Sequence, residues 1–504
     1  MSVREISTAA SGRSGGIQSA GPRWLPRSWP RDLLVLPPVL CLIVLTSFLQ
    51  PTDSDYWWHI RTGQYIVDTG TLPREDLFSY TARGHPWVTH EWLSEVVLYA
   101  TFGPLGYAGN VLLFALLSAL TWIAVYATCR LHGLGELGAL LLMMACFAVS
   151  LGALNVRVQV VTMLLLATTA WLLTRYRLGE RRALWVIPPL LVLWVNLHGG
   201  YVVGLGILGL TVVGEALAHL LRQPAAPLRP LVVGTALATL ATLLNPHGVN
   251  ALLYPFSYAG AQNASRLYVA EWQSPDFHQP YFMLFAGLLL LTMCLGLGLR
   301  PLGPTDLLWA VAFTLMALQS ARHIPLCAII LVPLVAARLQ SVLPALRRPL
   351  ARWRQPAGPL LLWPPLIAAC LVLVLESAEQ GKPLQLRREP DAAGYPAAAV
   401  AYLRERAPEG NLFNEYLWGG YLIYELYPGR QVFIDGRADV YGDALMEAFM
   451  AVATLRPEWH QVLDRYDVRI ALIRKDGPLS VMLRDTPGWE RLYADDLAEI
   501  YRRP

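Results

Sequence analysis

Long apolar runs, separated by short polar connections, follow one another along the chain from about residue 32 to residue 376. Most come close to the roughly 20 residues that an α-helix needs to cross the hydrocarbon core of a bilayer. Several are short or contain Pro and Gly, so one of them could be re-entrant or split. The pattern predicts an α-helical polytopic membrane protein with about eleven transmembrane helices. We place these helices near 32–50, 107–128, 135–154, 158–174, 183–197, 201–221, 229–244, 281–299, 304–320, 324–339 and 359–376.

Composition supports this assignment and excludes other classes. The chain has 504 residues, of which 55% are hydrophobic and only 15% are charged, and its mean hydropathy is +0.41. These values lie outside the range of soluble globular domains. The net charge of +4 is too small to indicate nucleic-acid binding. The 6 cysteines lie in or beside apolar runs without CxxC spacing, so they predict neither a disulfide framework nor a metal site.

The arginines of the short connections predict the topology. If the N-terminal tail at 1–31 is cytoplasmic and disordered, every short Arg-rich connection falls on the cytoplasmic side, as the positive-inside rule requires. These arginines are Arg130, Arg175, Arg177, Arg181, Arg182, Arg222, Arg229, Arg300, Arg338, Arg347, Arg348, Arg352 and Arg354. We therefore expect a multi-pass protein of the inner or plasma membrane, with a cytoplasmic N-terminus and an extracytoplasmic C-terminus.

The first outer loop, at 51–95, is unusually long and rich in acids, histidines and aromatics. Asp53 and Asp55 stand just past the first span, and two carboxylates at this spacing can bind a divalent metal such as Mg or Mn. Alternatively, one of them can act as a general base. Trp58 belongs either to an interfacial aromatic belt or to the wall of a site. Glu91, beside His90, is a further candidate in the same loop.

Other polar residues gather at the outer ends of the predicted helices. Arg157 and Arg322 either pair with an acid such as Asp53 or Asp276, or form a fork that holds a phosphate. His198 and His247 end spans at this face, His323 follows Arg322, and Glu271 precedes Trp272. The histidines could be helix caps or could line a cavity, and a carboxylate beside an indole could position a hydroxyl-rich substrate. Polar groups at one end of a bundle suggest a shared cavity.

The composition changes after the last apolar run. Residues 377–390 read as a polar linker, and 391–504 as a small soluble α/β domain with a mostly parallel sheet. The predicted helices lie at 397–406, 445–455 and 459–466, and the predicted strands at 411–413, 431–434, 470–473 and 499–502.

This C-terminal domain has candidate ligand residues of its own. Trp418 and Tyr421 flank a Gly pair that permits close backbone approach. Asp435 and Arg437 either contact a ligand at a strand end or form an internal pair that braces their loop against the membrane domain. The chain contains no Walker A, GxGxxG or GxSxG motif, so ATP, NAD or hydrolase chemistry has no support.

The many spans, the acidic pair of the first outer loop and the soluble C-terminal domain together resemble the GT-C superfamily of membrane glycosyltransferases. The overall pattern is also similar to that of a broad group of bacterial membrane proteins. The resemblance implies that Asp53 or Asp55 is the catalytic base or a metal ligand. The stretch from Tyr416 to Asp439 is similar to the oligosaccharyltransferase WWDYGY segment and its downstream Asp, with Trp418 standing where that segment has its aspartate.

The resemblance implies transfer of a hexose or pentose from a polyprenyl-phosphate-linked donor to an acceptor at the extracytoplasmic face. The acceptor could be a glycan, a lipid or a protein of the cell envelope. Two other functions stay open. A transporter or flippase of lipid-linked saccharides would predict inverted repeats, and we find no internal repeat. A non-catalytic envelope assembly protein would tolerate the loss of Asp53 and Asp55.

Overall fold

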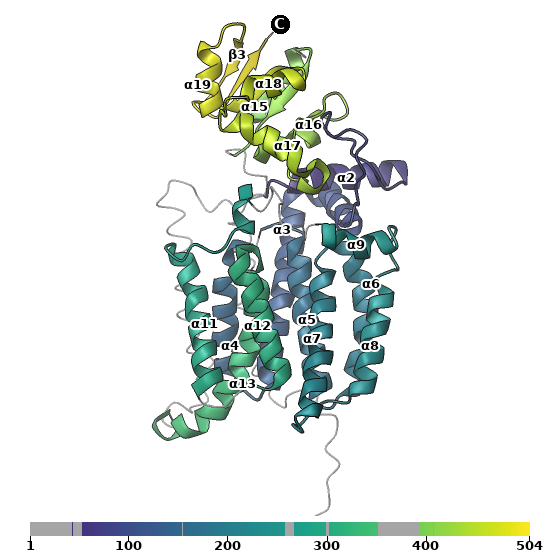
Figure 1. Cartoon of the computed structure of the whole chain (residues 1–504), viewed down its shortest axis with the longest axis vertical. Coiled ribbons are helices and arrows are strands. Elements are labelled where there is room, and N and C mark those ends of the chain that lie inside the picture. Colours follow the sequence, from purple (N-terminus) through teal and green to yellow (C-terminus); the bar gives the residue numbers. More distant parts are fainter. Residues whose placement is uncertain are drawn as a thin grey trace, which may run out of the picture.

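In the computed structural model of the chain, an upright bundle of helices carries a small α/β unit at one end (Figure 1). The structure describes residues 43, 53–153, 155–257, 267–298, 302–350, 394–406 and 408–503. The tail predicted at 1–31, the spans predicted at 32–50 and 359–376 and the linker predicted at 377–390 lie outside these residues, apart from Ile43.

The helices of the bundle coincide with nine of the predicted spans, counted over the described residues. They are α3 (Trp92–Leu131), α4 (Glu136–Val149), α5 (Gln159–Arg177), α6 (Ile187–Leu197), α7 (Tyr201–Leu220), α8 (Leu228–Ala241), α11 (Pro280–Gly298), α12 (Pro304–Gln319) and α13 (Ile324–Leu350). Within the described ranges, 3 helices are long and apolar enough to cross a membrane by length and composition. They span Trp92–Leu131, Tyr201–Leu220 and Ala321–Ser341.

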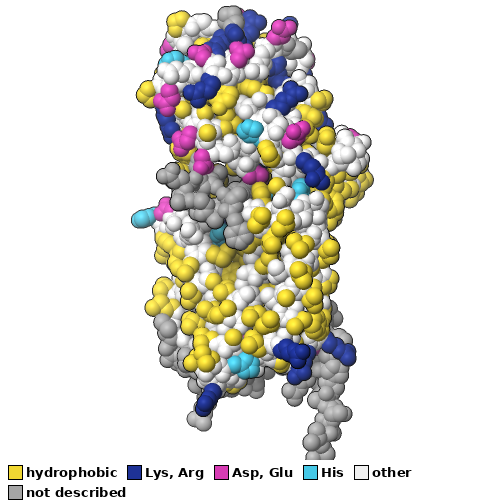
Figure 2. Space-filling model, turned by 45° about the vertical axis from the view of Figure 1, so that its right-hand side comes forward, with side chains coloured by type: hydrophobic (Ala, Val, Ile, Leu, Met, Phe, Trp, Pro, Cys, Tyr) yellow, Lys and Arg dark blue, Asp and Glu magenta, His cyan; other side chains and the backbone are white. Residues whose placement is uncertain are grey.

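Hydrophobic side chains cover the outside of the bundle as well as its inside. Figure 2 shows a broad apolar surface around the helices and arginines at the end remote from the α/β unit. Leucines such as Leu116 on α3 and Leu141 on α4 are exposed, whereas Trp122 and Trp194 are fully buried between helices. A helix bundle that is apolar on both sides is typical of a protein whose solvent is lipid. The fold is therefore that of a multi-pass membrane protein.

Helix α3 is divided by a break at Gly106, where φ is 62° and ψ is −162°. Only glycine adopts this conformation without a steric penalty. Pro104 lies just before the break, and a proline inside a helix removes a hydrogen bond and favours a kink. The first part of α3 consequently lies under the α/β unit, while the second part runs through the bundle.

The first outer loop is ordered between the bundle and the α/β unit. It begins with α2 (Tyr56–Thr69), which lies across the end of the bundle near α9 (Val249–Ser257) (Figure 1). The apolar face of α2 is buried against α3 and includes Tyr56, Trp57 and Trp58. The Nδ2 atom of Asn110 in α3 donates a hydrogen bond of 2.9 Å to the Tyr56 hydroxyl. These aromatic contacts fix the start of α2, which carries Asp53 and Asp55.

We call residues 394–503, which form the α/β unit, the C-terminal domain. Its helices are α15 (Ala397–Arg406), α16 (Gly419–Leu426), α17 (Ala438–Ala453), α18 (Trp459–Arg465) and α19 (Pro478–Asp485). Its strands are β1 (Asn411–Asn414), β2 (Val468–Arg474), β3 (Glu490–Ala494) and β4 (Ala498–Arg502), in the sheet order β1-β2-β4-β3. Three of the predicted strands thus lie within β1, β2 and β4, and the predicted helices coincide with α15, α18 and part of α17.

The expectation of a mostly parallel sheet is wrong. Only β1 and β2 pair in parallel, whereas β2 with β4 and β3 with β4 are antiparallel. A tight turn explains the hairpin of β3 and β4, because the Asp495 carboxylate accepts hydrogen bonds from the backbone N–H groups of Leu497 and Ala498. Such an Asx turn reverses the chain within a few residues.

The strand predicted at 431–434 is also wrong, because this segment pairs outside the sheet. Val432 exchanges backbone hydrogen bonds with Phe78 and Tyr80 of the first outer loop, at 3.1 and 3.2 Å. The β propensity of the segment is therefore used to attach the C-terminal domain to that loop.

Candidate active site

The carboxylates of Asp53 and Asp55 lie together where α2 begins. The backbone N–H of Asp55 donates to Asp53 Oδ1 at 2.9 Å. Asp53 Oδ2 accepts a hydrogen bond of 3.2 Å from Asn155 Nδ2 and lies 3.4 Å from Arg157 Nε. Asp53 is thus held by three donors, whereas Asp55 occupies the N-cap position of α2 without a side-chain capping bond.

Arg157 connects Asp53 to a second acid, Glu271. Its guanidinium donates to both Glu271 oxygens, the Nη2 bond measuring 2.6 Å. Arg322 Nη1 approaches Glu271 Oε1 at 3.2 Å, and the Arg322 guanidinium lies 5.1 Å from the ring centre of Trp272. Burial alone would raise the pKa of Glu271, but the hydrogen bond from Arg157 and the charges of both arginines hold this pKa below its ordinary value.

Both arginines therefore pair with acids, as one of the two sequence interpretations expected. Arg157 pairs with Asp53 as proposed, but the partner of Arg322 is Glu271 and not Asp276. Asp276 instead accepts a 2.8 Å contact from His278 in an exposed position. The arginines and acids form one network at the end of the bundle that faces the C-terminal domain.

The C-terminal domain covers Asp55 through two glycines. A Cβ atom on Gly436 would lie 1.8 Å from Asp55 Oδ1, and one on Gly420 would lie 2.5 Å from the Ser54 carbonyl oxygen. A larger residue would displace the Asp55 carboxylate at the first position and the backbone at the second. Burial raises the pKa of Asp55 to about 6, and the charge of Asp53 adds to this shift while Arg157 and His59 oppose it.

A second cluster is centred on Glu91, beside the first. Its carboxylate lies 3.5 Å from His59 Nε2, 3.5 Å from His90 Nε2 and 3.2 Å from His198 Nε2. His59 Nδ1 also lies 3.4 Å from Glu95 Oε1. His59 stands one helical turn after Asp55, and Glu95 stands one turn after Glu91. The two side chains of each pair therefore lie on the same face of their helix.

The histidines of this cluster differ in protonation. His198 Nδ1 accepts a hydrogen bond of 2.8 Å from the Gly200 N–H, which leaves its Nε2–H to donate to Glu91. Burial lowers the pKa of His198 to about 3, so that this ring is neutral. Burial would also lower the pKa of His90, but the hydrogen bond and charge of Glu91 raise it to about 9. Glu91 is thus an ionised hub that orients three imidazoles.

Other predicted site residues lie outside these clusters. His247 Nε2 approaches the Thr89 carbonyl at 3.3 Å, and His323 Nδ1 approaches the Met316 carbonyl at 3.3 Å. Trp418 is buried within the C-terminal domain, where its Nε1–H donates to the Gly394 carbonyl at 3.1 Å. Tyr421 packs on Trp57, with ring centres 5.3 Å apart. These contacts hold the segments around the site, and His323 helps to lower the pKa of Glu271.

Trp58 lies between the clusters. Its ring centre is 3.6 Å from that of His59 and 6.2 Å from that of Trp87. The side chain is buried, so it is neither an exposed belt residue nor free to stack on a ligand.

Asp435 and Arg437 form the internal pair that was one of the two interpretations. Arg437 donates to both Asp435 oxygens, at 2.8 and 2.7 Å, and its Nη1 lies 2.8 Å from Asp76 Oδ1 of the first outer loop. The guanidinium also lies 4.7 Å from the ring centre of Trp87. The pair is fully buried and braces the C-terminal domain against the first outer loop.

Sequence reasoning missed the roles of His59, Glu95, Asn155 and Asp76. The i, i+4 spacing of Asp55 with His59 and of Glu91 with Glu95 was a usable signal, because it places both members of each pair on one helix face. Asp76 carried no such signal, since its partner lies in another part of the chain.

The fold is similar to that of solved membrane glycosyltransferases, in agreement with the GT-C resemblance of the sequence. Among solved structures, the archaeal oligosaccharyltransferase AglB from Archaeoglobus fulgidus, in complex with an inhibitory peptide and a dolichol-phosphate, superimposes with a TM-score of 0.58. The two are 13% identical, and the match covers 94% of this chain and 74% of that one.

A second similar structure is that of ArnT from Cupriavidus metallidurans in the apo state, with a TM-score of 0.52 and 13% identity. That match covers 94% of this chain and 98% of ArnT. No protein-family model matches the chain, and neither does any curated protein. At these identities the likeness establishes the fold.

Proposed function

We propose that this chain is a membrane glycosyltransferase that moves a sugar from a polyprenyl-phosphate-linked donor to an acceptor. The reaction takes place at the end of the bundle under the C-terminal domain. The observation that carries the proposal is the position of Asp55, beside an arginine–carboxylate network at the end of a GT-C bundle. The AglB structure contains a dolichol-phosphate, which supports a lipid-phosphate donor for a chain of this fold.

Asp55 is the general base of the proposed reaction. A hydroxyl or amine of the acceptor loses its proton to the Asp55 carboxylate as its oxygen or nitrogen attacks C1 of the donor sugar. The bond from C1 to the phosphate oxygen breaks, and the polyprenyl phosphate leaves with the electron pair. A base with a pKa of about 6 is well matched to neutral pH, because it is ionised yet still basic enough to accept the proton.

Arg322 is the group that we propose meets the charge of the departing phosphate. Among the described residues its ion-pair partner is Glu271, reached through Nη1, and a guanidinium carries five N–H donors. Arg157 is engaged by both Glu271 and Asp53, so its part is to hold those carboxylates in place. A fixed donor beside a leaving phosphate stabilises the transition state more than the ground state.

The donor set at Asp53 does not fit a divalent metal. Asp53 faces Arg157, Asn155 and the Asp55 amide, and a Mg or Mn ion between Asp53 and Asp55 would have to displace the guanidinium. Within the described part of the chain, no group of three or more His, Cys, Asp or Glu side chains is arranged to hold a metal ion. We therefore propose that Arg157 balances the charge of Asp53, and we expect sugar transfer to persist in EDTA, measured against a buffer control.

Glu91 and its histidines are proposed to position α2 and thereby Asp55.

We further propose that the end of the bundle with the C-terminal domain faces away from the cytoplasm. Arg177, which pairs with Glu215 and Asp306, is the last residue of α5, whose first residue Gln159 donates to the Arg322 carbonyl at the site. Figure 2 shows Lys and Arg side chains at the end remote from the C-terminal domain. Positive charge marks the cytoplasmic side of membrane proteins.

The reaction class is tested with purified protein in liposomes that contain polyprenyl-phosphate-linked sugars. The proposal expects two products in equal amounts, free polyprenyl phosphate and a glycosylated acceptor, both measured by mass spectrometry. Movement of lipid-linked sugar across the bilayer without release of polyprenyl phosphate would contradict it and favour a flippase. Absence of both transfer and movement, across a panel of donors that the protein binds, would favour an assembly role.

A further inference from the structure

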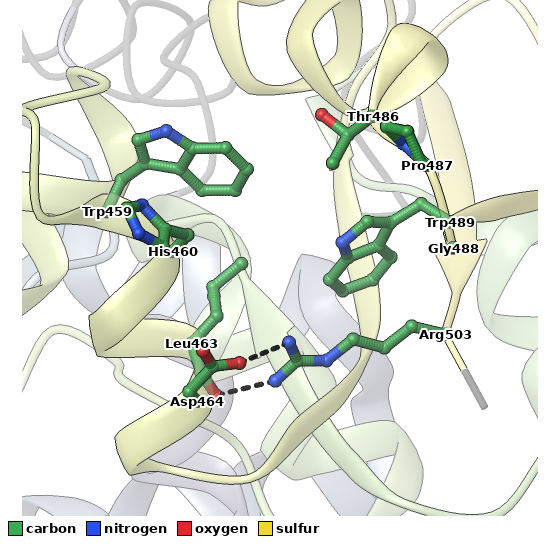
Figure 3. A pocket seen from close by; sticks show the side chains of 9 residues that line it. All are labelled: Trp459, His460, Leu463, Asp464, Thr486, Pro487, Gly488, Trp489 and Arg503. Carbon is green, nitrogen blue, oxygen red and sulfur yellow. Dashed lines mark hydrogen bonds and ion pairs between the residues drawn. The ribbon is translucent and has the colours of Figure 1, made fainter.

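The C-terminal domain contains a pocket in the part of the domain farther from the bundle. It is an open cavity of about 460 Å³, which is within the rough range of small-molecule sites. Trp459 of α18 and Trp489, just before β3, lie on opposite sides, with Leu463 and Arg503 between them (Figure 3). Neither Asp53 nor Asp55 lines this pocket, so it is separate from the site described above.

A defined turn positions one of the two walls. Thr486, Pro487, Gly488 and Trp489 form a tight turn in which the Trp489 N–H donates to the Thr486 carbonyl at 3.3 Å. Gly488 has a φ of 89°, and Pro followed by Gly at the two central positions is the signature of a type II turn. The indole of Trp489 is therefore presented by a rigid element, which reduces the entropy lost on binding.

The floor of the pocket is polar and equally well fixed. Arg503 Nη1 donates to Asp464 Oδ1 at 2.5 Å, while its Nη2 and Nε donate to the carbonyls of Leu463 and Val468 at 3.0 and 2.5 Å. The Asp464 side chain is 61% exposed. Its carboxylate can therefore accept further hydrogen bonds from a ligand, and the arginine holds it in place.

The two features together define the ligand. The two half-buried indoles offer apolar surface, with the Arg503 guanidinium 5.4 Å from the ring centre of Trp489. The Asp464–Arg503 pair offers hydrogen-bond acceptors and donors with no net charge. Such a site favours neither an anion nor a cation but a neutral molecule with apolar faces and hydroxyls around its edge. We propose that this pocket binds a saccharide, with a sugar ring against the indoles and its hydroxyls on the Asp464–Arg503 pair.

The proposed role of the pocket rests on the proposed function. A transferase that acts on a polymeric glycan gains affinity and residence time if a second unit of the acceptor is held at a distance from the reacting end. Figure 1 places α18 and β3 away from the bundle, so the pocket would hold a part of the acceptor that is remote from the reacting end. A proline-rich peptide also uses aromatic grooves, but it has few hydroxyls or amides to engage the charged floor.

The test measures binding by the full-length protein in nanodiscs, because detergents with sugar headgroups would compete. The probes are chitotriose, mannotriose and cellotriose, and a polyproline peptide serves for comparison. Binding of each probe is measured by calorimetry and saturation-transfer NMR. Trp459→Ala and Trp489→Ala should each weaken the binding of the preferred trisaccharide by roughly tenfold or more. Asp464→Asn should weaken it while leaving the thermal unfolding temperature unchanged.

The matched control is Tyr402→Ala, which removes one ring of an aromatic pair elsewhere in the same domain, where Tyr402 and Tyr493 lie 5.2 Å apart. Saturable trisaccharide binding that the pocket variants lose and the control keeps supports the proposal. No saturable binding of any trisaccharide at millimolar concentration overturns it, as does binding that the tryptophan variants leave intact, or binding of the peptide alone. Because Asp55→Asn protein should bind the trisaccharide as well as the wild type, a failure of the transferase proposal is distinguishable from a failure of this one.

Discussion

Asp55 lies among opposing charges, and their balance sets its protonation. Burial and the neighbouring Asp53 favour the neutral acid, whereas Arg157 and His59 favour the carboxylate. Arg157 in turn is held by Glu271. A substitution at any of these positions therefore changes the basicity of Asp55 without touching it.

The pH dependence of transfer should report this carboxyl group. Its pKa is raised from 3.8 to about 6, so on lowering the pH Asp55 becomes protonated, and loses its function as a base, while an ordinary aspartate would still be ionised. We expect kcat/KM to fall about tenfold per pH unit below pH 6 and to be level above it. The measurement is the pH–rate profile of the purified protein, and a profile that stays flat down to about pH 5 would contradict the assignment.

The sequence could predict which residues meet at the end of the bundle, because Asp53, Arg157, Glu271 and Arg322 all stand at helix ends that the predicted topology places on one side. It could not predict that Arg157 would pair with Asp53, the contact on which our proposal of a site without a metal rests. Whether two long side chains pair depends on rotation of the helices about their axes, and hydropathy does not report that angle.

Two short segments of the C-terminal domain pack against Ser54 and Asp55 at the candidate active site. The loop at Gly436 and the start of α16 at Gly420 lie against the backbone and side chains of 54–55. Both approaches are possible because these residues lack a Cβ atom. The segment from Tyr416 to Asp439 thus contacts Ser54 and Asp55 through glycines.

Gly436→Ala tests the importance of this close approach. Since the added Cβ would lie 1.8 Å from Asp55 Oδ1, either the Asp55 carboxylate or the loop must move, and a displacement of about 1 Å at a catalytic group can cost roughly 100-fold in kcat. Gly394→Ala is the matched control, because a Cβ at that position meets nothing within 4 Å. Equal transfer rates for both variants would show that the loop at 435–437 does not position Asp55.

Most of the helices could be predicted from hydropathy, whereas two features of the sheet could not. The segment at 431–434 has a strand-like sequence, but the backbone hydrogen bonds of Val432 go to Phe78 and Tyr80, and those of Phe433 and Ile434 go to the Asn414 side chain. Strand β3 has exposed or half-buried side chains throughout, so it shows no apolar run. In both cases the partner of the backbone, rather than the local pattern, decides the structure.

At the scale of the whole molecule, the C-terminal domain is attached to the bundle through the first outer loop. Asp76 of that loop and Asp435 share the buried guanidinium of Arg437, with Trp87 against its face. Val432 adds the backbone hydrogen bonds described above. The sequence could predict the Asp435–Arg437 pair, but it could not predict that Asp76 of a distant segment joins this pair.

Arg437→Ala should destabilise this attachment strongly. Removing one partner of a buried ion pair leaves Asp76 and Asp435 uncompensated, which costs about 3–5 kcal/mol. Arg502→Ala, which breaks the exposed pair with Glu490, should cost no more than about 1 kcal/mol. Chemical unfolding of both variants in detergent measures the difference, and equal stabilities would contradict a bracing role for Arg437.

The central claim is that Asp55 accepts the proton in sugar transfer, and the transfer rate of Asp55→Asn tests it most directly. The amide keeps the size of the side chain but cannot act as a base, so kcat should fall by roughly 100-fold or more while the affinity for the polyprenyl-phosphate donor is retained. Transfer by Asp55→Asn at the rate of the wild-type protein would contradict the account.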